Sequence, residues 1–414
     1  MRTDLSVTRS TRPFPAVGQW GPAVAALVFG LGVACAGAQT PDPNEVHESG
    51  GHRFRLVTVA DGLQNPWSIA FLPDGDVLVT ERGHNEGGPA QLRVIRNGAL
   101  VAEPVSGLPA IRVGNQGGLL DVVPHPDFAT NRLLYISYSK PSADGATGTT
   151  AIIRGRFEGT ALTDVEEIFE ADAWSKGMGH YGSRIAFDAD GYLFFTVGDR
   201  QAPPSGNLET HPAQDLSNHQ GTVNRLHDDG RVPDDNPFVS RANAEPSIWS
   251  YGHRSPQGLA IDPATGNIWQ TEHGPQGGDE LNLIRKGLNY GWPVIGYGVN
   301  YGPDRRPIHA SAVRQGMEQP TRYWVPSIAT SGIMIYSGDM FPNWKGNIFM
   351  GGMNGNQSMA RLVMNGTRVT SEEKMLGASL RVRDIRQGPD GSIYVALDDR
   401  GAARTAVVRM ERVD

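Results

Sequence analysis

The sequence predicts an all-β fold, a six-bladed β-propeller with four-stranded blades. Its 414 residues include 52 glycines and 29 prolines, a composition that favours short strands and tight turns over helices. A hairpin pattern, in which a turn separates two apolar runs, recurs six times along the chain. The copies begin about 50 to 80 residues apart, a spacing typical of propeller blades, which bury their faces against their neighbours.

The first copy shows the pattern most clearly, because an apolar run and an alternating run flank the turn Pro73-Asp74-Gly75. A third strand-like run follows most copies, as at 92–96 and 281–285. Two longer stretches, 201–243 and 289–323, exceed what a hairpin needs and are expected to be loops at one end of the central tunnel. The six copies lie at residues 68–80, 120–137, 185–197, 259–271, 332–351 and 385–397.

A long β-sandwich or a pair of β domains is the alternative fold. No interior segment resembles a linker between domains, and six-fold self-similarity is difficult to obtain from a sandwich. One closed propeller domain is therefore expected over residues 53–414.

The N-terminal segment differs from the rest of the chain. Arginines at 2, 9 and 12 precede an apolar stretch, 23–38, that ends in small residues and is short for a membrane span. This pattern predicts a signal peptide over residues 1–38, followed by a flexible tether over 39–52. The mature chain is expected to be periplasmic or secreted and to contain no transmembrane segment.

The single cysteine, Cys35, lies within the predicted signal peptide, so the mature chain would contain no thiol. Lipidation of Cys35 is an alternative. The preceding residues 32–34, Gly-Val-Ala, lack the leucine expected three residues before a lipidated cysteine, which favours simple cleavage.

Charge and motifs exclude several classes of function. The net charge is −7 and the chain has no dense run of lysine and arginine, which argues against nucleic acid or an anionic membrane as a partner. No dinucleotide fingerprint, phosphate-binding loop, His-Glu-x-x-His or Cys-x-x-Cys motif is present. Nicotinamide, nucleotide and zinc chemistry therefore have no support in the sequence.

Two glycine-rich segments next to predicted strands could aim side chains into the central channel. The segment 114–119 has one long hydrogen-bonding side chain, Gln116, and could equally be a surface turn. The segment 177–184 places His180 just before a strand, where its imidazole could serve as a base. An ordinary loop histidine is the alternative.

Three further segments carry charge. Arg254, in the rigid turn 252–258, suits an anion or a developing oxyanion, although it could simply pair with a neighbouring blade. The segment 271–280 offers carboxylates and loop carbonyls appropriate to calcium, or is a solvated acidic turn. Strand alternation puts Arg381 and Arg383 on one face, where they require an anion such as a dicarboxylate or tricarboxylate cofactor, or a structural acid such as Asp384.

These segments carry a family resemblance. Residues 252–258 follow the pattern Gly-His-Arg-x-Pro-Gln-Gly, residues 274–283 are Gly-Pro-Gln-Gly-Gly-Asp-Glu-Leu-Asn-Leu, and residues 289–293 are Asn-Tyr-Gly-Trp-Pro. The chain resembles the soluble quinoprotein glucose/sorbosone dehydrogenases, a group that includes bacterial aldose sugar dehydrogenases. The resemblance runs from about residue 62 through the final hairpin copy.

The resemblance implies a propeller that holds pyrroloquinoline quinone (PQQ) and calcium and oxidises aldoses at the anomeric carbon to lactones, passing electrons to an unidentified acceptor. His180 matches the proton acceptor, while hydride passes to the quinone, and Arg254 would stabilise the oxygen charge. Calcium would be bound through the backbone of Gly274 and Pro275, and a second, structural calcium at Glu280 and the backbone of Tyr290. The positions that match quinone contacts are Gln116, Arg254, Ser255, Tyr301, Gly352, Met353, Asn354, Gly355, Arg381 and Arg383.

Two positions depart from the family pattern. Ser255 stands where relatives commonly have asparagine, and Asn354 stands where they often have a cofactor-binding lysine. These departures motivate an alternative, a non-redox carbohydrate- or protein-binding propeller with a decayed quinone site. Lactone hydrolysis on a calcium propeller is a third possibility, but it needs acidic metal ligands at the channel centre, where the arginines stand.

Overall fold

The computed structural model describes residues 41–84, 88–354, 357–377, 380–398 and 405–414. The predicted signal peptide, Cys35 and Gly355 lie outside these residues. Among the residues described, no helix is long and apolar enough to cross a membrane.

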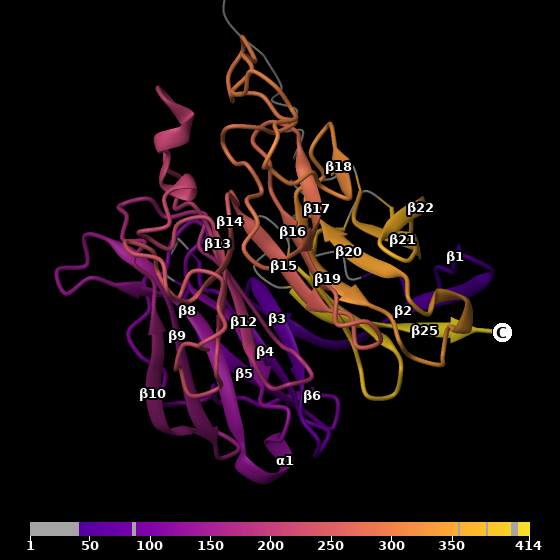
Figure 1. Ribbon diagram of the computed structural model, residues 1–414. Coiled ribbons are helices and arrows are strands. Elements are labelled where there is room, and N and C mark those ends of the chain that lie inside the picture. The colour runs from indigo at the N-terminus through magenta and orange to yellow at the C-terminus, as the bar shows by residue number, and fades with distance from the viewer. Residues whose placement is uncertain (1–40, 85–87, 355–356, 378–379, 399–404) are drawn as a thin grey trace, which may run out of the picture. The chain divides into compact units, whose positions relative to one another are not determined.

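Six antiparallel sheets arranged as propeller blades make up the described chain (Figure 1), which confirms the all-β prediction. Each predicted hairpin copy corresponds to the first two strands of one sheet. The first three blades are β3 (Pro66–Phe71), β4 (Val77–Glu81), β5 (Gln91–Arg96) and β6 (Ala99–Leu100); β7 (Leu119–Pro124), β8 (Leu133–Pro141), β9 (Gly148–Phe157) and β10 (Leu162–Glu170); and β11 (Gly182–Phe187), β12 (Leu193–Val197), β13 (Thr222–Leu226) and β14 (Ile248–Tyr251).

The remaining blades follow in chain order, and short helices occur only in connections among the described residues. The helices are α1 (Phe128–Asn131), η1 (Leu208–Thr210), η2 (Pro212–Gln214) and η3 (Pro342–Trp344). The blades are β15 (Pro256–Ile261), β16 (Ile268–Glu272), β17 (Asp279–Ile284) and β18 (Arg322–Trp324); β19 (Thr330–Ile335), β20 (Ile348–Gly352), β21 (Met359–Asn365) and β22 (Arg368–Lys374); and β23 (Val382–Gln387), β24 (Ile393–Leu397) and β25 (Thr405–Val413) with β2 (His52–Leu63) and β1 (His47–Ser49).

The sixth blade closes the ring with both ends of the folded chain. β25 pairs with β24 on one side and with β2 on the other, from Arg53 opposite Val413 to Leu63 opposite Thr405. β1 adds a fifth strand, with His47 opposite Phe54 and the two rings stacked at 5.3 Å. Residues 47–52 therefore belong to the sheet and not to the tether expected over 39–52.

The stretch 201–243 was expected to be a loop throughout, and this prediction is wrong in part. It contains β13, the third strand of blade three, whose residues are all buried. The polar side chains of Asn224 and Arg225 obscured the strand in the sequence; Arg225 reaches Asn236 in the following loop at 2.8 Å. The stretch 289–323 does run as a connection until β18 begins at Arg322.

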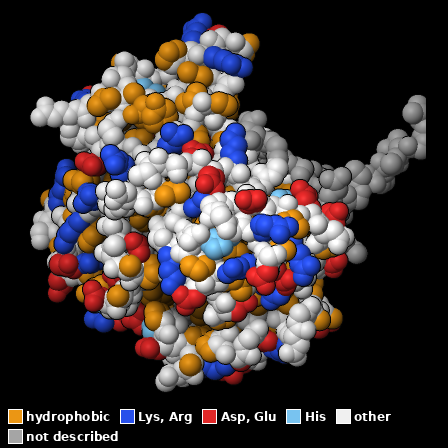
Figure 2. Space-filling model, turned by 90° about the vertical axis from the view of Figure 1, so that its right-hand side faces the viewer, with side chains coloured by type: hydrophobic (Ala, Val, Ile, Leu, Met, Phe, Trp, Pro, Cys, Tyr) orange, Lys and Arg blue, Asp and Glu red, His pale blue; other side chains and the backbone are white. Residues whose placement is uncertain are grey.

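Apolar clusters between adjacent blades form the core. One joins blades one and two through residues such as Leu78 and Leu134, and the largest joins blades five and six around Trp344 and Val395. Burial of such side chains is worth about 1.5–3 kcal/mol each. On the face shown in Figure 2, acidic and basic side chains are interspersed, without a large patch of one sign.

An ionic cluster fills the channel centre, where the first strands of the blades meet. Arg184 of β11 is fully buried; its Nη1 lies 3.0 Å from Asp384 Oδ1 and 3.6 Å from Asp121 Oδ1, and its guanidinium covers the Trp67 ring at 3.9 Å. Arg386 bridges the same two carboxylates at 2.9 and 3.0 Å. This cluster ties four blades together at their inner strands.

Candidate active site

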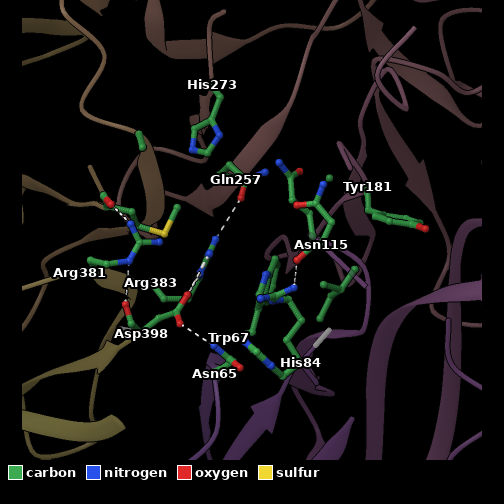
Figure 3. Close-up of a pocket in the computed structure, with 16 residues that line it drawn as sticks. Asn65, Trp67, His84, Asn115, Tyr181, Gln257, His273, Arg381, Arg383 and Asp398 are labelled. Atoms are coloured by element: carbon green, nitrogen blue, oxygen red, sulfur yellow. Dashed lines mark hydrogen bonds and ion pairs between the residues drawn. The ribbon is translucent and has the colours of Figure 1, made fainter. Parts of the chain in front are cut away.

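A cavity of about 310 Å³ lies at one end of the inner strands (Figure 3). Side chains from all six blades surround it, so it exists only when the ring is closed. Arg184 Nε and Nη2 donate to the backbone oxygens of Gln257 and Arg383, which connects the central ionic cluster to the cavity wall. The lining residues are Asn65, Trp67, Arg82, His84, Asn115, Gln116, Leu120, Tyr181, Gly182, Gln257, His273, Ala329, Met353, Arg381, Arg383 and Asp398.

Arg381, which directly precedes β23, and Arg383 within it both line this cavity, so the two arginines share one face as was predicted. The acid beside both arginines is Asp398 (Figure 3). Its carboxylate oxygen Oδ2 lies 3.1 Å from Arg383 Nη2, and its backbone oxygen accepts from Arg381 Nε at 3.0 Å. Asn65 Nδ2 donates to Asp398 Oδ1 at 3.0 Å. Burial alone would raise the pKa of Asp398, but Arg383 and Asn65 outweigh it and hold this pKa below its usual value. The acid proposed from the sequence, Asp384, lies in the central ionic cluster instead, because the next residue of a strand points the other way.

A third arginine, Arg82, lines the same cavity and was missed in the sequence. It follows β4 directly, as Asp398 follows β24, His273 follows β16 and Met353 follows β20. The residue after the second strand of a blade thus repeatedly reaches the cavity, and this periodic position is the signal that could have identified Arg82. Among the described residues that line the cavity, three are arginines and one is an aspartate, which makes this part of the lining positively charged.

A second cavity, of about 320 Å³, shares Gln116 with the first and is lined by the predicted base, His180. Arg254 and Tyr301 line it as well, together with the rings of Pro203 and Trp292. A site with this lining offers an apolar wall beside a buried base and a fixed positive charge. The full lining is Gln116, His180, Asp199, Gln201, Ala202, Pro203, Pro204, Arg254, Pro275, Trp292, Asn300, Tyr301 and Ile308.

His180 is oriented by a carboxylate that the sequence did not reveal. Its Nδ1 lies 2.6 Å from Asp199 Oδ1, and Trp292 Nε1 donates to Asp199 Oδ2 at 2.7 Å. Burial lowers the pKa of His180, and Arg254 lowers it further, against the opposing effect of Asp199. The imidazole is therefore held neutral, with Nε2 left to act as a base.

The turn that carries His180 is clamped from two sides. Gln116 Oε1 accepts from the His180 backbone N–H at 2.7 Å. Arg200, also fully buried, donates to the carbonyl oxygens of Gly177, at 2.9 Å, and Gly179, and its guanidinium lies 3.4 Å above the Tyr181 ring. His180 has a φ of +51°, a strained conformation for a residue with a side chain. The clamp holds this conformation in place.

Arg254 lies next to the predicted calcium ligands. Its Nη1 donates to the backbone oxygens of His273, at 3.0 Å, and Gly274, at 2.7 Å. Tyr301 donates its hydroxyl to the Pro275 oxygen at 3.0 Å. Each carbonyl oxygen has a second lone pair, so the oxygens of Gly274 and Pro275 could each also bind a cation. These are hard oxygen donors of the kind that calcium prefers.

Glu280 and Tyr290, the other predicted metal residues, line a small third cavity with Glu272. The Glu272 carboxylate accepts from the backbone N–H of Arg254 at 2.6 Å, whereas burial and Glu272 itself raise the pKa of Glu280. The buried Asn282 Oδ1 has no hydrogen-bond partner. A cation would relieve both features, although no group of three or more acidic, histidine or cysteine side chains within the described residues is arranged to hold a metal ion.

Some of the residues predicted to contact the quinone line neither the first nor the second cavity. Ser255 is fully buried and its hydroxyl accepts from Gln257 Nε2 at 3.2 Å. The Asn354 side chain donates to the Ser327 backbone oxygen. The backbone N–H of Gly352 donates to the Ser358 oxygen at the end of blade five. Met353 lines the first cavity, which is called the arginine cavity below because Arg82, Arg381 and Arg383 line it. The departure at Ser255 therefore lies behind the cavity wall.

The chain is similar to known sugar dehydrogenases over most of its length. The family model described as glucose / sorbosone dehydrogenase matches residues 63–408. The aldose sugar dehydrogenase YliI of Escherichia coli is 40% identical over 348 residues, which are 83% of this chain and 90% of that protein.

Solved structures agree with this similarity. The apo form of the soluble aldose sugar dehydrogenase from Escherichia coli superposes with a TM-score of 0.78 at 38% identity, covering 87% of this chain and 100% of that one. The PQQ-bound aldose sugar dehydrogenase from Streptomyces coelicolor gives a TM-score of 0.67 at 25% identity, covering 90% and 100%. The chain therefore belongs to the glucose/sorbosone dehydrogenase family.

Proposed function

We propose that this protein oxidises aldose sugars at the anomeric carbon to lactones, with PQQ in the arginine cavity and calcium at the carbonyl oxygens of Gly274 and Pro275. The observation that carries the proposal is the buried His180–Asp199 pair in the cavity next to the three arginines. An oriented base beside a polyanion-binding cavity is an arrangement that a binding protein does not need.

The residues of the arginine cavity fit the chemistry of this cofactor. PQQ is a flat tricarboxylate, and Arg82, Arg381 and Arg383 offer positive charge that Asp398 neutralises only in part. Trp67 and Met353 add apolar surface for a planar ring system. When bound, the quinone supplies an electrophilic carbonyl carbon that accepts hydride, and calcium polarises that carbonyl.

His180 would remove the proton of the anomeric hydroxyl through Nε2, because Nδ1 is engaged with Asp199. The imidazolium that forms is stabilised by the Asp199 carboxylate, which Trp292 holds in place. Arg254 contributes a fixed positive charge at the same cavity, where it stabilises negative charge that develops on oxygen. Trp292 and Pro203 would contact the apolar faces of the sugar ring and exclude water from the base.

Reconstitution tests this function directly. Purified apoprotein supplied with PQQ and calcium should reduce a dye in the presence of aldoses, and no turnover over a broad sugar panel would contradict the proposal. His180→Ala should keep quinone binding, followed by its absorbance, and lose at least about 100-fold in turnover. His227→Ala is a matched control, because His227 lines none of the cavities described here.

The alternative of a decayed, non-redox propeller rested on Ser255 and Asn354. Ser255 lies outside the cavities and Asn354 bonds to backbone, so neither substitution removes the arginines that support quinone binding. A pure binding module would show no saturable, calcium-dependent change in quinone absorbance. Lactone hydrolysis in the absence of quinone would favour the third possibility.

The N-terminal pattern supports export of this protein to the periplasm or the medium. A mature N-terminus near residue 39, found by mass spectrometry of the exported protein, is the result expected for cleavage after Ala38.

A further inference from the structure

Arg82 has a backbone fixed at the junction of blades one and two. Its N–H donates to the Asn65 oxygen at 3.1 Å, and its oxygen accepts from the Leu119 N–H at 3.2 Å. Gly118 allows this approach, because a Cβ there would lie 1.7 Å from the Arg82 oxygen and 2.7 Å from its Cγ. The start of the Arg82 side chain is therefore held in one direction, toward the cavity that its guanidinium lines.

Among the residues that the structure describes, no carboxylate pairs directly with Arg82. The nearest acid of the cavity, Asp398, already accepts from Asn65 on one oxygen and from Arg383 on the other. Within the described ranges, the Arg82 guanidinium has no carboxylate within 4.0 Å, and it donates to the Asn115 backbone oxygen. Burial, Arg383 and Arg381 together lower the pKa of Arg82 to about 10, so the guanidinium stays protonated at neutral pH.

Such an arrangement is costly unless an anion completes it. Three guanidiniums converge on one cavity whose described lining includes one carboxylate, that of Asp398, and like charges at close range destabilise one another. Several carboxylates on one rigid ligand would meet this demand, since arginine binds carboxylates through paired N–H donors.

We propose that Arg82 is a third carboxylate-binding arginine of this site, which acts with Arg381 and Arg383 to bind a polycarboxylate anion. The inference rests on the proposed function only for the identity of the ligand, PQQ. The charge of the cavity supports any rigid polycarboxylate of suitable size. Arg82 belongs to the first blade and the other two arginines to the last, so the ligand would bridge the junction where the ring closes.

The test is equilibrium binding without catalysis, with two probes, PQQ followed by its absorbance and benzene-1,3,5-tricarboxylate followed by calorimetry. Arg82→Met keeps the length of the stem and removes the charge, and it should weaken binding of both probes by about 10- to 100-fold. Arg82→Lys keeps the charge without the paired donors, and it should lose less. Both probes should also raise the melting temperature of the unsubstituted protein, because they bind only the folded state.

Arg96→Gln is the matched control, because Arg96 lies on the same blade, pairs with Asp76 and lines none of the cavities. Unchanged affinity of both probes in Arg82→Met and Arg82→Lys would overturn the inference, as would equal losses in the Arg96 control. Loss of tricarboxylate binding in Arg82→Met, combined with no PQQ binding by the unsubstituted protein, would support the inference and contradict the proposed function.

Discussion

The Nδ1 atom of His180 lies 2.6 Å from the Oδ1 atom of Asp199, and both side chains are buried. This contact fixes the imidazole proton on Nδ1 and leaves Nε2 as the basic nitrogen at the cavity. It also sets the charge balance of the base, since Asp199 raises the pKa of His180 while burial and Arg254 lower it. The orientation and the basicity of His180 therefore depend on one carboxylate.

Asp199→Asn should reduce kcat by at least about 100-fold, because the amide no longer fixes the tautomer of His180. The acid limb of kcat/KM should move to lower pH, since removal of an anion lowers the pKa of His180 further. Trp292→Phe is the comparison, because it removes one bond to Asp199 and keeps the charge. Its acid limb should move less than that of Asp199→Asn. An unchanged acid limb in Asp199→Asn would show that His180 is not the titrating base.

Arg200→Met should lower kcat by about 10- to 100-fold, because the carbonyl oxygens of Gly177 and Gly179 lose their donor and Gln116 alone then holds the His180 turn. Quinone affinity, measured by absorbance titration, should change little, since Arg200 does not line the arginine cavity. Arg200→Lys should not restore kcat, because one ammonium cannot bond two carbonyls and cover the Tyr181 ring. Equal losses of kcat and of quinone affinity would indicate a general structural role instead.

Arg184→Met should destabilise the fold by about 3 kcal/mol, because Asp121 and Asp384 would keep only Arg386 as a cation in the channel centre. Urea denaturation of both proteins at pH 7 measures the difference in the free energy of unfolding, and a loss below about 1 kcal/mol would contradict the ion-pair explanation.

His219 predicts a dependence of stability on pH. Its Nδ1 accepts from the Asp172 N–H at 2.9 Å, a bond that requires the neutral ring, and burial lowers its pKa to about 4. Because the unfolded chain binds this proton near pH 6.5, stability should fall by up to about 3 kcal/mol between pH 6.5 and pH 4. His219→Gln removes this contribution, so its stability curve should be flatter over that interval. A parallel curve in the variant would assign the pH dependence to other groups.

The blades were predictable because their signal is local. Residues 68–80 alternate with period two around a turn, and each copy of this pattern became the first hairpin of a sheet. β13 was missed because Asn224 and Arg225 are satisfied by partners in the loops around them, which the sequence does not reveal.

The candidate site was predictable only where a residue is conspicuous by itself. His180 lies between glycines, and Arg381 and Arg383 stand two residues apart at the start of β23. Asp199, Arg82 and Asp398 stand beside other charged residues at or just after the ends of strands, where a charged surface turn would look the same. Their roles come from contacts across blades; Asn65 and Asp398, for example, are 333 positions apart.

The closure of the ring by β2 and β25 also constrains the order in which the protein can mature. Arg82 and Asn65 are synthesised more than 300 residues before Asp398, and the last strand, β25, ends at Val413. A chain that lacks β25 would have five complete blades and an open ring. Under the proposed function, cofactor binding is expected to require that the last strand has joined the first, and so to report that folding is finished.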